Sequence, residues 1–237
     1  MTRQAGYNFS FTTNASLLTP QLADELLEAG VGPLAFSVDA TNQQTYQNLQ
    51  QGNLAQVERN ILDFQSRFLA RYGYFSGTMS FVVSAENAHE QEAYKQKWLS
   101  RGFHVTFYAR HDCQRNMRPY TLFLPRAPRR SPCLASWHTL FLNRAMQAVT
   151  CSWGSWATSP TAQSPTLVDR DAGLFWRKNP AYTTFAEHGR KLQKHCGHCT
   201  NWAEMQRQLT RTPQGELVST ALGSQTWIPS TENKTNG

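Results

Sequence analysis

The sequence predicts an α/β protein, in which a partial parallel β/α barrel precedes a small cysteine-rich domain that contains a β-hairpin. Three observations carry this prediction. Short β-type runs alternate with helical stretches over residues 7–110, a proline-rich basic stretch follows at 118–132, and four of the five cysteines lie after it. We therefore expect a barrel-type domain over 1–125, a cysteine-rich domain over 126–215 and a polar tail over 216–237.

The first β/α unit is predicted from a β-type run and clear helix boundaries. Residues 7–13 favour a strand that ends before Asn14. Thr19 followed by Pro20 predicts a helix start, because Thr accepts a hydrogen bond from an unpaired backbone N–H and Pro suits the first turn. Gly30 predicts the end of that helix, since glycine tolerates the left-handed backbone that often closes one.

The following units repeat this scheme. The predicted strands are 33–39, 78–83 and 103–108, and the predicted helices are 54–70 and 87–101. Strands that alternate with helices favour a parallel sheet with right-handed crossovers. Three units and a fourth strand fall short of a closed barrel, so we expect a core that is truncated at its front.

Composition limits the classes of partner. The chain of 237 residues is 40% hydrophobic and 16% charged, which is typical of an ordered globular protein. Its net charge is +7, but the 23 basic residues are scattered, so nucleic acid is not an expected partner. No apolar stretch has the length of a signal peptide core or of a membrane span, and we expect a cytoplasmic protein without membrane contact.

Four cysteines form a candidate metal site. Cys196 and Cys199 are a C-x2-C pair, a spacing that lets two thiolates bind one metal centre. Residues 137–150 are predicted to form a β-hairpin that brings Cys133 and Cys151 together. Four thiolates suit either a [4Fe–4S] cluster or a structural zinc ion, and spacing alone leaves both open. Unrelated buried cysteines are the alternative interpretation.

The order of motifs in the N-terminal half resembles that of radical SAM enzymes. The residues concerned are 11–14, 17–20, 36–40 and 45–46, which correspond to the family texts TNG, LLTPE, S-x-DG and TYE. The C-terminal half, with motifs at 133–137, 150–153, 173–176 and 196–202, is similar to the SPASM or twitch-type extension that carries an auxiliary cluster.

The resemblance implies roles for individual residues. It places the cofactor S-adenosyl-L-methionine (SAM) against three polar residues at strand ends: Asn14, Ser37 and Asp39. It assigns an auxiliary [4Fe–4S] cluster to four ligands: Cys133, Cys151, Cys196 and Cys199. The competing interpretation of the polar strand ends is that their side chains cap the following loop.

The sequence also departs from the family. It lacks the C-x3-C-x2-C motif of the catalytic cluster, and Ala15 and Ala40 stand where the family usually has glycine. No residue is therefore assigned as catalytic, and SAM is expected to act only if the missing N-terminal segment is supplied. The expected partners are a peptide or protein substrate, or a separate chain that supplies this segment. A non-catalytic zinc-stabilised module and a degenerate fragment are the alternatives.

Overall fold

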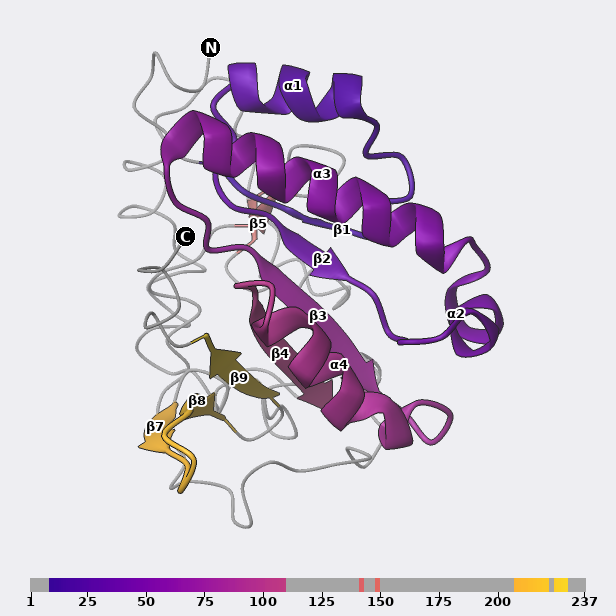
Figure 1. Ribbon diagram of the computed structural model, residues 1–237, viewed down its shortest axis with the longest axis vertical. Helices are drawn as coiled ribbons and strands as arrows, with labels where there is room; N and C mark the ends of the chain where they lie inside the picture. The colour runs from indigo at the N-terminus through magenta and orange to yellow at the C-terminus, as the bar shows by residue number, and fades with distance from the viewer. Residues whose placement is uncertain (1–8, 110–140, 143–147, 150–206, 222–223, 230–237) are drawn as a thin grey trace. The chain divides into compact units, whose positions relative to one another are not determined.

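The computed structural model describes residues 9–109, 141–142, 148–149, 207–221 and 224–229 (Figure 1). The residues up to 109 and those from 208 onward belong to one compact unit. The two short segments between them belong to a second unit.

The first unit contains a seven-stranded mixed sheet in the order β1-β2-β3-β4-β9-β8-β7. Its strands are β1 (Thr12–Thr13), β2 (Ala35–Ser37), β3 (Thr78–Val83), β4 (His104–Ala109), β7 (Gln208–Arg211), β8 (Leu217–Thr220) and β9 (Ser224–Ile228). Neighbouring strands among β1 to β4 run parallel, which confirms the predicted β/α alternation. The sheet is open, with β1 and β7 at its edges, so a closed or partial barrel is not confirmed.

Four α-helices connect the parallel strands. They are α1 (Pro20–Glu28), α2 (Gln43–Gln50), α3 (Leu54–Tyr72) and α4 (Gln91–Leu99), the last preceded by the 3-10 turn η1 (Ala88–Glu90). The predicted N-cap of the first helix is confirmed, because the Thr19 hydroxyl accepts a hydrogen bond from the Leu22 amide at 3.2 Å. The long helix and the last helix of the prediction also form, close to their expected bounds.

Aromatic side chains join the helices to one face of the sheet. Phe36 of β2 packs edge-on against Phe64 of α3, with ring centroids 6.0 Å apart. Phe81 of β3 packs in the same way against Tyr94 of α4, at 4.7 Å. Because Phe36 pairs in register with Met79, which is two residues from Phe81, both aromatic residues of the sheet lie on the same face. Helices α3 and α4 therefore cover one face, as Figure 1 shows.

The C-terminal strands complete the sheet on its antiparallel side. Strand β9 pairs with β4, with Trp227 opposite Val105, and β8 and β7 follow outward. The region expected to be a polar tail after residue 216 thus contains two strands of the sheet. Local pattern did not predict them, because their hydrogen-bonding partners lie in other strands: β4 and β8 flank β9, and β9 and β7 flank β8.

The described part of the second unit is a two-stranded antiparallel pair, β5 (Phe141–Leu142) and β6 (Ala148–Val149). This pair confirms the core of the β-hairpin predicted over residues 137–150. The proline-rich stretch at 118–132 and the remainder of the predicted cysteine-rich domain lie outside the described residues.

Candidate functional site

The carboxyl edge of the parallel strands holds the three polar residues singled out in the sequence. Asn14 follows β1 directly, Ser37 is the last residue of β2, and Asp39 lies two positions beyond it. Thr13 pairs with Phe36 in register, so Asn14 and Ser37 come next to each other along neighbouring strands. The carboxyl ends of parallel strands are where α/β proteins place ligands, which makes this edge the candidate site.

Asn14 uses its side chain locally. Its Oδ1 accepts hydrogen bonds from the Ser16 amide at 3.1 Å and from the Ser16 hydroxyl at 2.8 Å. The next residue, Ala15, has a left-handed backbone with a φ of 57°, a conformation that glycine adopts more readily. The buried side chain of Asn60 donates to the Ala15 carbonyl at 2.8 Å and holds this turn in place. The departure from glycine noted in the sequence therefore falls at a position where the backbone favours glycine.

Asp39 joins two strand ends. Its Oδ1 accepts a hydrogen bond from the Val82 amide of β3 at 2.8 Å. Burial raises the pKa of the Asp39 carboxyl, and the Val82 hydrogen bond only partly opposes this. Burial, and secondly the charge of Asp39, also raise the pKa of the Tyr46 hydroxyl. The site thus contains a half-buried carboxyl group whose charged form is disfavoured by burial.

Gln50, at the end of α2, contacts the backbone on both sides of Val38. Its Nε2 donates to the Ser37 carbonyl at 3.3 Å, and its Oε1 accepts from the Asp39 amide at 3.2 Å. These are the two backbone groups that flank a residue paired in a parallel ladder, so one side-chain amide satisfies both.

Asn87, which follows β3, links the ends of β2 and β3 through its side chain. This residue is fully buried. Its Nδ2 donates to the carbonyls of Asp39 and Val82, each at 2.9 Å. Its Oδ1 accepts from the Ser84 amide at 2.7 Å. Asn87 thereby holds the backbone that follows both strands. It bonds the main chain of Asp39, whereas the side-chain carboxylate of Asp39 bonds the Val82 amide.

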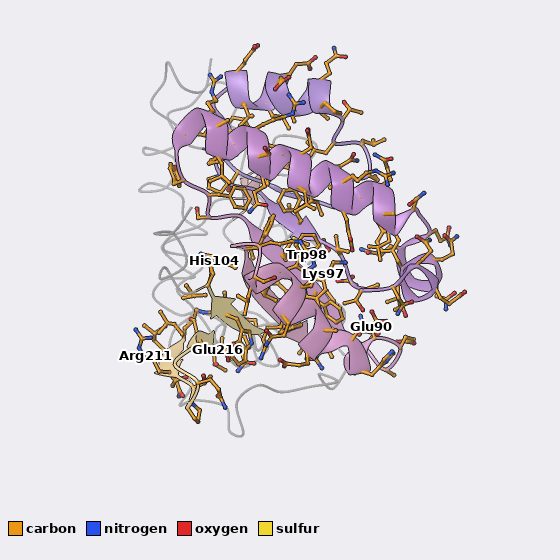
Figure 2. The ribbon with its side chains drawn as sticks, viewed as in Figure 1. Glu90, Lys97, Trp98, His104, Arg211 and Glu216 are labelled. Atoms are coloured by element: carbon orange, nitrogen blue, oxygen red, sulfur yellow. The ribbon has the colours of Figure 1, made fainter. Side chains whose placement is uncertain are left out.

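Glu90 lies at the N-terminal end of α4 (Figure 2) and secures the loop that follows Asp39. Its buried carboxylate accepts hydrogen bonds from the Thr41 amide and hydroxyl, and from Asn42 Nδ2 at 2.8 Å. Burial by itself raises the pKa of Glu90, but hydrogen bonds from Thr41 and Thr45 outweigh it and hold that pKa below its usual range. The loop is therefore anchored by a charged group.

A row of hydroxyl side chains crosses the sheet from Ser37. Register places Ser37 beside Ser80, Ser80 beside Thr106, Thr106 beside Thr226, and Thr226 beside Ser219. The Oγ1 atoms of Thr106 and Thr226 lie 3.0 Å apart. Since side chains alternate along a strand, this row lies on the face opposite α3 and α4. Cross-strand hydroxyl pairs also stabilise sheets, which is the simplest account of the row.

The structure brings together only part of the predicted site. Ser37 and Asp39 share one strand end, whereas all four predicted ligands, Cys133, Cys151, Cys196 and Cys199, lie outside the described residues. Among the residues that are described, no group of three or more His, Cys, Asp or Glu side chains is arranged to hold a metal ion.

Sequence reasoning missed the roles of Gln50, Asn87 and Glu90. Asn87 resembled an ordinary helix start, yet its side chain makes no capping bond to the turn that it precedes. Gln50 had no local signal, because its two partners lie 13 and 11 positions away.

Comparison with known proteins adds no relative: no protein-family model, curated protein or solved structure matches this chain. Within the described ranges, no helix is both long and apolar enough to cross a membrane.

Proposed function

We propose that this chain is an iron–sulfur protein of the radical SAM/SPASM type. In this proposal it is the C-terminal part of an enzyme that generates a 5′-deoxyadenosyl radical to modify a peptide, a protein or a small molecule. Cys133, Cys151, Cys196 and Cys199 would hold one auxiliary [4Fe–4S] cluster, and the carboxyl edge with Asn14, Ser37 and Asp39 would contact SAM.

The observation that carries the proposal is the placement of the three polar residues. Asn14 and Ser37 come at the carboxyl ends of two adjacent parallel strands, in the order in which the resembling motifs occur. Asp39 lies two positions beyond β2, with the unfavourable burial that functional carboxylates often have.

The open edge of the sheet supports the expectation of a further segment. Among the described residues, no strand pairs with the outer side of β1, whereas β9 occupies the outer side of β4. A parallel strand added by a separate chain, or by a preceding segment, would extend the parallel half of the sheet beside β1. Such a segment would also be the source of the catalytic cluster motif that the sequence lacks.

The four proposed cysteine ligands suit a [4Fe–4S] cluster. Four cysteine thiolates are the usual ligands of a [4Fe–4S] cluster, and no other ligand type is required. When bound, an auxiliary cluster supplies electron transfer or a point of attachment for substrate. The chain would contribute the four thiolates and the surroundings that tune the potential of the cluster.

Anaerobic reconstitution with iron and sulfide tests the cluster. The full chain should bind about four irons and show thiolate-to-iron absorption, and Cys196→Ser should lose most of both. The fifth cysteine offers a matched control, because Cys113→Ser removes a thiol outside the proposed set and should bind iron like the wild type. Fewer than about three irons per wild-type chain would contradict the assignment.

Elemental analysis of aerobically purified protein tests the competing zinc site. One zinc per chain that persists in air, with no iron after reconstitution, would favour a zinc-stabilised interaction module instead. A cooperative thermal transition of the purified chain would exclude a degenerate product that does not fold.

A further inference from the structure

We propose that Gln50 is a positioning residue for the candidate ligand site, and that its side-chain amide fixes the Ser37–Asp39 segment in strand geometry. This inference rests on the proposed function of the carboxyl edge. Gln50 is not among the site residues assigned from the sequence, and its role emerges from two hydrogen bonds to the backbone of Ser37 and Asp39.

The first step is the point at which β1 stops. Thr12 and Thr13 pair with Ala35 and Phe36, so continued pairing would place the next residues of β1 beside Ser37 and the residue after it. Instead the chain turns away at Ala15, in a left-handed conformation. The backbone of β2 beyond Phe36 therefore loses its partner strand on this side.

The second step is what replaces that partner. In a parallel ladder, one residue donates its N–H to a carbonyl and accepts from the amide two positions later on its neighbour. Gln50 does both with its side chain, because Nε2 donates to Ser37 and Oε1 accepts from Asp39. The side-chain amide thus substitutes for a peptide group and extends the ladder past the end of β1.

The third step is the consequence for the side chains. Strand geometry turns Ser37 and Asp39 to one face and the fully buried Val38 to the other. On the opposite side of this segment, the Val38 amide donates to the Ser80 carbonyl at 3.1 Å. With both sides bonded, the two polar side chains are fixed before any ligand arrives, which lowers the entropic cost of binding.

The test compares three variants of the full chain. Gln50→Leu removes both hydrogen bonds, and Gln50→Glu keeps an acceptor for the Asp39 amide but has no donor for the Ser37 carbonyl at neutral pH. Gln47→Leu is the matched control, since Gln47 is exposed on the same helix.

Hydrogen exchange at the Asp39 amide is the direct measurement. In Gln50→Leu this amide should exchange about fivefold faster or more, because it loses its acceptor. Gln50→Glu should retain most of the protection, and Gln47→Leu should retain all of it. Unchanged protection in Gln50→Leu would overturn the positioning role, whatever the fate of the proposed function.

Titration of the labelled chain with SAM is the second measurement, followed through the Ser37 and Asp39 amide resonances. Binding should be weak, since the proposed iron anchor is not part of this chain, and Gln50→Leu should weaken it about tenfold. Equal affinity of wild type and Gln50→Leu would overturn the inference alone. No binding by the wild type would overturn the proposed SAM contact, and the exchange measurement would then still decide whether Gln50 holds the segment.

Discussion

The ammonium group of Lys95 lies 4.0 Å from the centre of the Trp227 ring, which joins α4 to the last strand of the sheet. Lys95 is almost fully buried, and its Nζ also contacts a carboxylate oxygen of Glu92 at 2.9 Å. The contact connects α4, which precedes β4 in the chain, to β9, which pairs with β4 in the same unit.

Replacing Lys95 with methionine should destabilise the chain by about 1 kcal/mol, since the apolar stem remains while the cation–π attraction is lost. Chemical denaturation of the full chain measures this change. Lys95→Arg keeps a cation over the ring and should lose less. A Lys95→Met variant as stable as the wild type would show that the contact contributes nothing.

Gln51 offers a stabilising substitution. It ends α2 with a φ of 52°, in the left-handed region where glycine is the favoured residue. Gln51→Gly should therefore raise the free energy of unfolding by about 0.5–1 kcal/mol. Gln47→Gly places the same residue inside the helix and should lower it by about 1 kcal/mol. Effects of the same sign in both variants would contradict the assigned backbone geometry.

Glu90 should matter most at neutral pH. Glu90→Gln removes the charge and places a side-chain NH2 group, which is a donor, against the Thr41 amide or Asn42 Nδ2, which are donors too. This change should lower the free energy of unfolding by about 2 kcal/mol. Because the folded-state pKa of Glu90 is lowered, its contribution is present above the unfolded pKa and is lost as pH falls through the folded pKa. Thermal melts across pH should therefore show the gap between wild type and variant narrowing in acid, and a gap of constant size would contradict this.

Asp39 should behave in the opposite sense. The folded-state pKa of Asp39 is raised. Its contribution to the free energy of unfolding is therefore present below the unfolded pKa and is lost as pH rises through the folded pKa. Asp39→Asn keeps an acceptor for the Val82 amide without the buried charge and should melt at a higher temperature at pH 7. The difference should vanish below about pH 4. A variant that is less stable than the wild type at pH 7 would show that the carboxylate serves stability rather than a ligand.

The parallel half of the fold was predictable because its signals are local. The 19 residues of α3 repeat apolar positions at helical spacing, and Thr19 and Gly30 mark the boundaries of α1 through their own chemistry. Strand β3 was predicted at its observed bounds, because a β-type run there lies between turn residues.

The antiparallel half was not predictable in the same way. Thr106 and Thr226 touch across 120 positions of sequence, and no local pattern encodes a pairing at that distance. The site shows the same division. Ser37 and Asp39 stand out as polar strand ends, whereas Gln50 acts through two backbone groups that any sequence would supply.

The pairing of β9 with β4 gives the chain an order of assembly. Strands β1 to β4 leave the ribosome before β9, so the partner strand of β4 on its outer side is absent until residues 224–228 have been made. During that interval the second unit is synthesised as an insertion between β4 and β7. A chain ended before residue 208 would keep this hydrogen-bonding edge open and prone to association. The strands after residue 207 thus cover an edge that the earlier part of the chain leaves exposed.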